Sequence, residues 1–342
     1  MESQALFFIA PHQVDVRQES LPALQAGQAR VQTICSAISP GTEMLIYRGE
    51  FPADLPLDET LSSLSGTFTY PLKYGYAVVG VVVGLGPGVN PTWLGQRVFA
   101  FQPHADQFIA AVDELQSVPH DISVEDAVFL PNMETAVNFI LDGAPAIGEQ
   151  VTVLGQGIVG LLTTALLVRF PLASLVTVDK YPIRRQAGLD LGASASLDPA
   201  QTEYLDAARR YLQGDRPYRG ADLIFELSGS PAALDQAISL CGFNSRVVVG
   251  SWYGTKRAAI DLGGRFHRNR IQLISSQVST VNPEMSGRWD KTRRFNLVWE
   301  MVKKIRPSRW ITQHFPFSQT SQAYQLIDQN PGETIQVVFS YP

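Results

Sequence analysis

Residues 151–160 read Val-Thr-Val-Leu-Gly-Gln-Gly-Ile-Val-Gly, and this stretch decides the fold. The β-branched run before Gly155 predicts a strand, and the apolar stretch 161–168 predicts a helix after it. Gly155, Gly157 and Gly160 give G-x-G-x-x-G spacing between the two elements. In this spacing the first glycine permits a tight turn, the second lets the backbone approach a ligand, and the third lets the helix pack on the strand. The stretch therefore predicts a strand–turn–helix unit with a ligand at the helix N-terminus.

The next apolar run ends in an acid, Asp179, which lies 19 residues after Gly160. A carboxylate at this distance binds the ribose hydroxyls of a dinucleotide whose pyrophosphate lies at the helix N-terminus. Because a carboxylate repels the 2′-phosphate of NADP, we predict NAD as the cofactor. Lys180, Arg184 and Arg185 follow closely, so NADP stays open. A glycine-rich turn without a ligand is the alternative interpretation of the motif.

Length and composition indicate a packed protein of two domains. The chain has 342 residues, of which 45% are apolar and 17% charged, with a formal net charge of −5. Its basic residues form no stripe, so nucleic acid is not expected as a partner. No run reaches the roughly 20 apolar residues of a membrane span, and the first residues lack a signal-peptide pattern. We expect a cytoplasmic protein with a small-molecule substrate and no membrane partner.

The two cysteines, Cys35 and Cys241, exclude a disulfide framework and a multi-cysteine zinc lobe. Both follow apolar residues, and we expect them to be buried, inert thiols.

The first third of the chain is predicted to be β-rich. Short apolar or alternating runs between Gly and Pro residues indicate strands at 5–9, 28–34, 77–84 and 97–101. Polar residues interrupt the leucines between positions 53 and 66, where we expect a loop that covers a ligand cleft.

From about residue 137 strands and helices alternate. The expected strands are 150–154, 175–179, 195–197, 222–227, 246–250 and 271–275, with helices such as 183–191 and 231–241 between them. This rhythm predicts a doubly wound parallel sheet, and its strands are apolar almost throughout, as is typical when both faces are covered.

The alternation stops after residue 283. The pattern predicts an amphipathic helix at 289–304, strands at 311–315 and 335–339, and a short helix at 321–328. We expect this tail to fold back onto the first domain. The predicted domains are thus 1–136 with 283–342, and 137–282.

Several motifs occur in the order found in one family: Ser-Ala-Ile-Ser-Pro-Gly-Thr-Glu (36–43), Tyr-Gly-Tyr-Ala-Val-Val-Gly (74–80), Gly-Gln-Arg-Val (95–98), Gly-Ala-Asp (220–222), Glu-Leu-Ser-Gly-Ser (226–230) and His-Phe-Pro-Phe (314–317). With them the chain resembles a medium-chain dehydrogenase/reductase of the alcohol dehydrogenase type over almost its whole length. Pro-Gly-Thr-Glu, and Gly-Tyr in place of Gly-His-Glu, are similar to the bacteriochlorophyllide dehydrogenase branch. The resemblance implies an α/β fold, with a GroES-like β-rich catalytic domain and a Rossmann domain. It also implies an NAD(P)-dependent oxidoreductase and a homodimer.

The positions that hold catalytic zinc in this family differ here. By resemblance, Ser39 replaces a Cys, while Tyr76 and Ala77 replace a His-Glu pair; the third ligand falls near Glu134. Hydroxyls are poor zinc ligands at neutral pH, and one carboxylate does not hold the metal. We therefore predict a zinc-independent member.

Without a metal, hydrogen-bond donors must polarise the substrate oxygen. Tyr76 is the leading candidate, although it could merely fill the lost zinc site. Thr42 matches the hydroxyl that relays protons in the family. Glu43 could bind Tyr76 or an arginine, or be a plain structural carboxylate. Glu134 could act as a general acid or base, or be a hydrogen-bonded carboxylate at a helix start.

The remaining candidates form two groups. His104, Tyr47, Arg48 and Trp252 are candidates for the substrate cleft, with a turn role for His104 and a surface role for Arg48 as the alternatives. Besides the glycines and Asp179, the residues expected at the cofactor are Gln156, Ile158, Val159, Lys180, Arg184, Thr135, Ser228, Gly229, Gly250 and Ser251.

Three functions remain open from the sequence. The first is hydride transfer to or from an alcohol or carbonyl substrate with NAD(H) and no zinc. The second is reduction of a C=C bond in an enone or quinone on the same fold. The third is a dinucleotide-binding protein without turnover.

Overall fold

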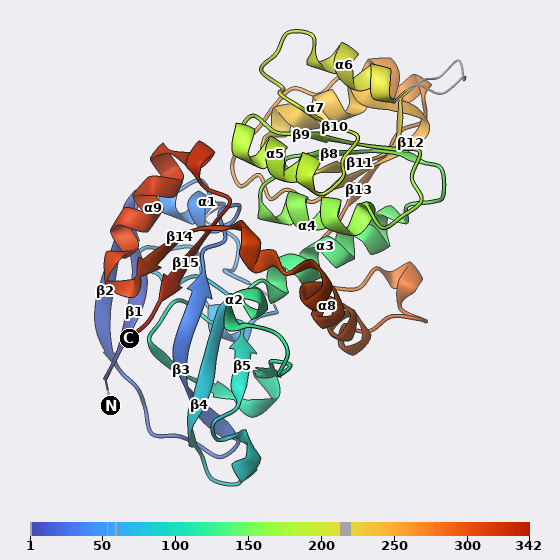
Figure 1. Ribbon diagram of the computed structural model, residues 1–342. Coiled ribbons are helices and arrows are strands. Elements are labelled where there is room, and N and C mark those ends of the chain that lie inside the picture. Colours follow the sequence, from blue (N-terminus) through green and yellow to red (C-terminus); the bar gives the residue numbers. More distant parts are fainter. Residues whose placement is uncertain (1, 53, 59, 213–219) are drawn as a thin grey trace. The chain divides into compact units, whose positions relative to one another are not determined.

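Figure 1 shows the computed structural model, which describes residues 2–52, 54–58, 60–212 and 220–342. Contacts divide the chain into two units: residues 1–131 with 299–342 form unit 1, and residues 132–298 form unit 2. Residues 283–298, which the sequence placed with the β-rich domain, group with unit 2. Arg294 is one reason, because its buried guanidinium bonds to Glu134 and Asn138 of the same unit.

A parallel sheet forms the centre of unit 2, with strand order β10-β9-β8-β11-β12-β13. Its strands are β8 (Gln150–Leu154), β9 (Ser174–Val178), β10 (Ala195–Leu197), β11 (Ala221–Glu226), β12 (Cys241–Val249) and β13 (Gln272–Ser275). The chain winds outward from β8 to β10, then returns to β11 beside β8. In such a sheet the ligand crevice lies at the carboxyl ends of the strands where the winding reverses, here β8 and β11. The doubly wound fold predicted from sequence is confirmed.

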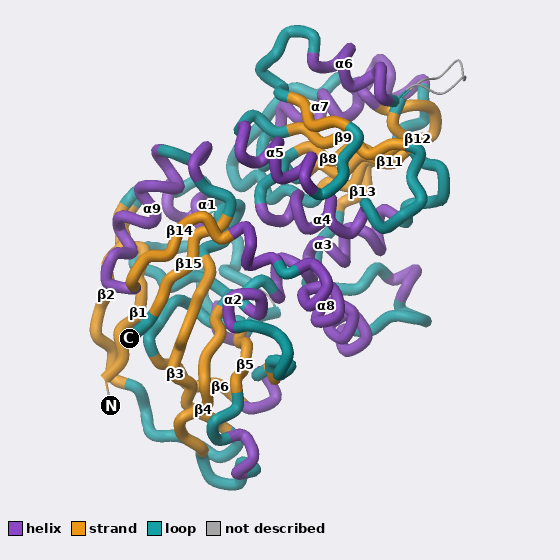
Figure 2. The backbone as a smooth tube through the Cα atoms, in the orientation of Figure 1, coloured by secondary structure: helices purple, strands orange, loops and turns teal. Residues whose placement is uncertain are grey.

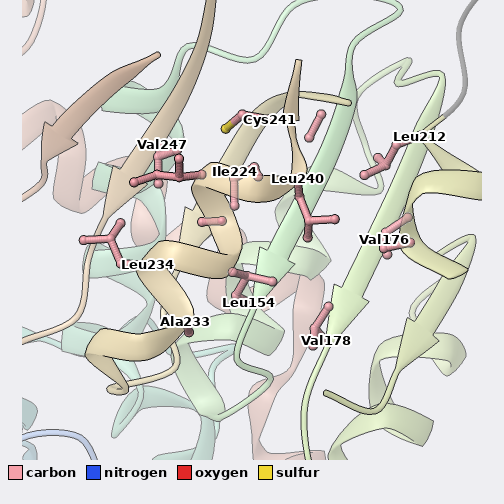
Figure 3. Close-up of a cluster of buried hydrophobic side chains, with 14 of the residues drawn as sticks. Leu154, Val176, Val178, Leu212, Ile224, Ala233, Leu234, Leu240, Cys241 and Val247 are labelled. Carbon is pink, nitrogen blue, oxygen red and sulfur yellow. The ribbon is translucent and has the colours of Figure 1, made fainter. Parts of the chain in front are cut away.

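The strands of this sheet are apolar because both faces are covered. In β11, Leu223 and Phe225 join one buried cluster, whereas Ile224 between them joins another. Figure 3 shows the second cluster, in which Ile224 packs with Leu154, Val176, Leu234 and Val247, among others. Successive side chains point to opposite faces of a strand, so a strand covered on both sides has no polar alternation. The helices of unit 2 are α3 (Leu130–Gly143), α4 (Ile158–Leu167), α5 (Pro182–Asp190), α6 (Tyr204–Tyr211), α7 (Pro231–Leu240) and α8 (Lys291–Ile305), of which α3 and α8 cross into unit 1.

Unit 1 is built on a mixed sheet with the order β14-β15-β3-β4-β5-β7, to which β6 adds by pairing with β3. The strands are β3 (Gln28–Ala37), β4 (Val78–Leu85), β5 (Arg97–Ala100), β6 (Gln107–Ala111), β7 (Gln116–Ser117), β14 (Ile311–Pro316) and β15 (Gln336–Ser340), and a separate hairpin pairs β1 (Glu2–Ala10) with β2 (Gln13–Ser20). Figure 2 shows β15 beside β3, to which it pairs antiparallel. The predicted return of the tail to the first domain is confirmed.

Short helices complete unit 1: α1 (Glu43–Arg48), α2 (Val124–Ala127) and α9 (Thr320–Gln329). The loop expected at 53–66 contains a 3₁₀ turn, Ser62–Leu64, while Ala53 and Glu59 lie outside the described residues. Cys35 and Cys241 are buried, as predicted, and burial raises the pKa of each thiol to about 12. Within the described ranges, no helix is long and apolar enough to cross a membrane.

Candidate active site

The turn after β8 is shaped by two glycines that the backbone requires. Gly155 has a φ of 92°, and a Cβ there would lie 2.6 Å from the carbonyl oxygen of Leu227. A Cβ on Gly160 would lie 1.9 Å from the carbonyl oxygen of Gly155, so helix α4 packs on the turn without room for a side chain. These contacts match the turn and packing roles predicted from the spacing.

Gly157 differs from its two neighbours, because packing does not require a glycine there. Among the described residues, a Cβ on Gly157 would approach nothing closer than Nη1 of Arg184, at 4.0 Å. Gly157 caps the N-terminus of α4, a ten-residue helix. The open space therefore lies where backbone N–H groups and the helix dipole favour a phosphate. The turn fits the pyrophosphate of a dinucleotide.

Asp179 lies directly after β9 and hydrogen-bonds to the backbone of the glycine turn and of its own loop. Its Oδ2 accepts from the N–H of Gln156 at 2.8 Å, and its Oδ1 accepts from the N–H of Tyr181 at 2.9 Å. Each carboxylate oxygen can accept more than one hydrogen bond, so capacity remains for ribose hydroxyls.

The basic residues after Asp179 have separate roles. The guanidinium of Arg184 lies 4.8 Å from the ring centroid of Tyr181 and beside the glycine turn. Burial lowers its pKa, although the negative charge of Asp179 opposes this shift. Lys180 is exposed and lies 5.6 Å from the same ring. Arg185 is engaged by the carbonyl of Asp179 and by an ion pair of 3.1 Å with Asp198.

The residues expected on either side of Gly157 contribute backbone rather than side chains. The amide of Gln156 turns inward, where it donates to the carbonyl of Gly155 and accepts from Thr164. Ile158 is buried, and Val159 packs against a core cluster of unit 2. Any ligand contact from these positions must come from the main chain.

An acid that sequence reasoning missed lies at the end of β11. Glu226 is fully buried; its Oε1 accepts from the N–H and hydroxyl of Ser228, and its Oε2 accepts from the hydroxyl of Tyr253 at 2.5 Å. The N–H of Gly229 donates to Ser251 at 2.9 Å, which joins the loops after β11 and β12. Gly250 is also fixed by packing, because a Cβ there would meet the ring of Phe139 at 2.2 Å. The sequence carries a signal for this acid, because Glu226 is the last residue of an apolar strand, just as Asp179 comes directly after the apolar strand β9.

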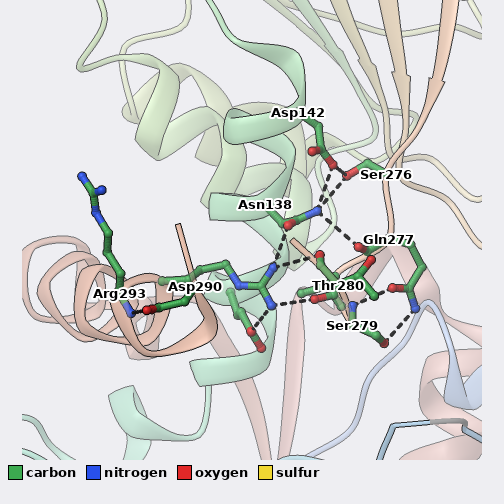
Figure 4. Close-up of polar contacts among 11 residues, drawn as sticks. Asn138, Asp142, Ser276, Gln277, Ser279, Thr280, Asp290 and Arg293 are labelled. Carbon is green, nitrogen blue, oxygen red and sulfur yellow. Dashed lines mark hydrogen bonds and ion pairs between the residues drawn. The ribbon is translucent and has the colours of Figure 1, made fainter. Parts of the chain in front are cut away.

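Glu134 is held by an arginine. Nη2 of the fully buried Arg294 lies 2.6 Å from Oε1 of Glu134, and its Nη1 donates to Asn138 at 2.7 Å. Figure 4 shows how this network continues from Asn138 to Asp142 and Ser276. Burial raises the pKa of the Glu134 carboxyl, and the charge of Arg294 opposes the rise. Thr135, the neighbouring cofactor candidate on α3, is half-buried.

In unit 1, Ser39, Thr42 and Tyr76 bring their hydroxyls together. Oγ of Ser39 lies 2.5 Å from Oη of Tyr76, which donates to Oγ1 of Thr42 at 3.3 Å. Burial raises the pKa of Tyr76, and the hydrogen bonds with the two smaller hydroxyls partly offset this. The phenol is therefore protonated at neutral pH and can donate a proton. We call these three residues the hydroxyl cluster.

Among the described residues, the hydrogen bonds of Glu43 go to partners other than Tyr76 or an arginine. It is fully buried, and its carboxylate accepts from the N–H of Ser39 at 2.7 Å and from the hydroxyl of Tyr324. Nε2 of His104 lies 3.1 Å from it, with no exposed surface on either side chain. His104 is thus interior support and does not line a cleft, which corrects its place among the substrate candidates.

The other substrate candidates are also engaged. Tyr47 is buried and stacked on Tyr324, with 5.4 Å between ring centroids, so its side chain is not available to line an open surface. Nε of Arg48 lies 2.6 Å from Asp328. Trp252 is half-buried in the loop after β12, in unit 2.

Comparison with known proteins agrees with this geometry. No family model matches the chain. It is 24% identical over 334 residues to D-guloside 3-dehydrogenase of Escherichia coli, covering 92% of this chain and 93% of that one. It is 25% identical over 300 residues to (R,R)-butanediol dehydrogenase of Bacillus subtilis, covering 79% and 82%. A crystal structure of the alcohol dehydrogenase rspB from E. coli, complexed with NADH, superposes with a TM-score of 0.80 at 18% identity, covering 99% of both chains.

Over most of its length the chain is thus similar to dehydrogenases of the medium-chain dehydrogenase/reductase type. The family resemblance inferred from the sequence motifs is thereby confirmed, and so is the expected fold of a β-rich unit with a Rossmann unit.

The residues at these positions do not fit catalytic zinc. The hydroxyls of Ser39 and Tyr76 bond directly to each other, Ala77 has no donor, and the carboxylate of Glu134 is paired with Arg294. Across the described part of the chain, no group of three or more His, Cys, Asp or Glu side chains is arranged to hold a metal ion. Zinc prefers thiolate, imidazole and carboxylate ligands, which these positions do not offer together.

Proposed function

We propose that this medium-chain dehydrogenase/reductase is an NAD(P)-dependent oxidoreductase that interconverts an alcohol and a carbonyl compound without zinc. One observation carries the proposal. The glycine turn keeps the space a dinucleotide needs, while hydrogen-bonded hydroxyls stand where zinc-dependent relatives carry metal ligands. The chain thus keeps the means to bind the redox cofactor and replaces the metal by proton donors.

The nicotinamide, when bound, supplies or accepts the hydride. The protein must hold the dinucleotide and manage one proton. Gly157 and the N-terminus of α4 would hold the pyrophosphate, and Asp179 would accept from the adenosine ribose. In carbonyl reduction Oη of Tyr76 would give its proton to the substrate oxygen as the carbon takes the hydride. The Thr42 hydroxyl would then donate to the phenolate, which would regain its proton from solvent, and the reverse steps would oxidise the alcohol.

The names of the relatives support the substrate class. They are dehydrogenases of butanediol, sorbitol and a guloside, which favours an alcohol as the reacting group.

We propose NAD rather than NADP because Asp179 places a carboxylate at the ribose position. Arg184 beside the glycine turn keeps NADP as the alternative. The cytoplasmic location and the homodimer stay predictions.

Deuterium transfer tests the proposal. The purified protein is incubated with C4-deuterated NADH or NADPH, of either face, and a panel of ketones, aldehydes and enones. We expect deuterium at the carbinol carbon of a ketone or aldehyde product. Deuterium at the β-carbon of an enone would instead assign C=C reduction. Tight NADH binding without transfer to any compound would assign a non-catalytic protein.

A further inference from the structure

A buried polar network lies next to the hydroxyl cluster in unit 1. Its centre is the pair Glu43 and His104, whose side chains are fully buried with 3.1 Å between Oε2 and Nε2. A buried charge is costly unless hydrogen bonds satisfy it, so a pair kept in this position needs a reason.

A chain of hydrogen bonds continues the network beyond the pair. Nδ1 of His104 lies 2.7 Å from Oγ of Ser36, which lies 2.7 Å from the hydroxyl of Tyr341. When Tyr341 donates to Ser36 and Ser36 donates to Nδ1, Nε2 of His104 donates to Glu43, and every group in the chain has a partner.

The network contacts the backbone at Ser39 and at Gly75, the residue before Tyr76. Glu43 accepts from the N–H of Ser39 at 2.7 Å. The imidazole of His104 packs on Gly75, the residue before Tyr76. A Cβ on Gly75 would lie 2.8 Å from Cδ2 of His104, and Gly75 has a φ of 120°. One end of the pair thus sets the main chain at Ser39, and the other sets it at Tyr76.

We infer that Glu43 and His104 are positioning residues, which hold the hydroxyls of Ser39 and Tyr76 at bonding distance through the Ser39 amide and the Gly75 backbone. The inference rests on the proposed function, in which Tyr76 moves the proton. Neither Glu43 nor His104 touches the substrate. Their effect belongs to the chemical step, because a misplaced proton donor slows that step without weakening cofactor binding.

Two substitutions of His104 separate the two bonds of its ring. In His104→Gln the longer amide reaches the position of Nε2 and still donates to Glu43. In His104→Asn the shorter amide reaches the position of Nδ1, meets Ser36 and leaves Glu43 without that donor. We expect His104→Asn to lower kcat about tenfold or more, with NADH affinity unchanged. We expect His104→Gln to keep most of the wild-type kcat.

The matched control is His314→Gln. His314 makes the same kind of bond on the surface, with Nε2 3.0 Å from Oε1 of Glu125, and both side chains are about half exposed. We expect its kcat to equal that of the wild type. If His104→Asn fails to fold, Tyr324→Phe removes a different donor from the same oxygen of Glu43 and must lower kcat in the same way.

Crystal structures of the variants give a readout that does not depend on turnover. The Ser39 Oγ to Tyr76 Oη distance should exceed about 3.5 Å in His104→Asn and stay short in His104→Gln. Equal kcat values and an unchanged distance in the two variants would overturn the inference. Absence of hydride transfer by the wild type would overturn the proposed function instead, and the distances would still decide the positioning role.

Discussion

Tyr76 is the residue on which the proposed chemistry depends most. By resemblance it stands where zinc-dependent relatives carry a histidine, and its phenol bonds to Ser39 and Thr42. Because burial raises its pKa, the phenol keeps its proton through the neutral range, and in the proposed mechanism it is the acid in carbonyl reduction.

Tyr76→Phe removes this proton donor and keeps the ring. We expect kcat for carbonyl reduction to fall about a hundredfold or more, the range of a lost general acid. NADH affinity, measured by fluorescence titration, should not change, because the substitution keeps the ring and leaves the glycine turn intact.

Tyr204→Phe is the matched control for a lost phenol. The Tyr204 hydroxyl is buried in unit 2 and has no hydrogen-bond partner among the described residues. Removing a buried unpaired hydroxyl is neutral or stabilising, so kcat and the melting temperature should be maintained. Equal activity in the two Tyr→Phe variants would exclude Tyr76 as the proton donor.

The glycine turn yields a prediction at the scale of an element. Gly160→Ala places a Cβ 1.9 Å from a carbonyl oxygen and should destabilise the fold by about 1–3 kcal/mol. Gly157→Ala adds a methyl group to open space at the start of α4. It should leave urea stability almost unchanged and weaken NADH binding about tenfold or more. The reverse pattern would show that the turn does not hold the phosphates.

Arg294 is the element-scale link between α3, α8 and the segment before α8. Arg294→Met leaves the Glu134 charge buried without a partner, so the free energy of unfolding should fall by about 3–5 kcal/mol. Adding Glu134→Gln should restore part of that loss in urea denaturation. Additive losses would mean that the two side chains do not stabilise each other.

Sequence patterns predicted the elements that follow a strong apolar period. Strands β8 and β10 begin and end at the predicted residues, because their runs are apolar and end in turn residues. Strand β2 was missed, since its side chains are mostly exposed and polar. The tight turn after β8 followed from the glycine spacing and its strand-and-helix context. The hydrogen-bond partners of Glu43, Glu134 and His104 could not be predicted from the sequence. These partners, Tyr324, Arg294 and Ser36, lie far away in the chain.

At the scale of the whole molecule, buried thiols make stability depend on alkaline pH. Burial raises the pKa of Cys35 and Cys241 from 9.0 to about 12. The folded state therefore binds these protons more tightly than the unfolded chain does. Their contribution is full below about pH 9 and is lost as pH rises from 9 to 12. The melting temperature should fall over this window, and less steeply in Cys35→Ala/Cys241→Ala. Identical slopes would contradict the burial effect.

The proposed enzyme joins a dinucleotide-binding turn to a hydroxyl cluster in place of a metal. Turnover is therefore expected to need no zinc. The direct measurement is kcat as a function of zinc per chain, determined on one preparation after chelator dialysis and after stepwise addition of zinc. We predict that kcat with less than about 0.1 zinc ion per chain equals kcat after one equivalent of zinc has been added. A kcat that rises in proportion to bound zinc would contradict the claim.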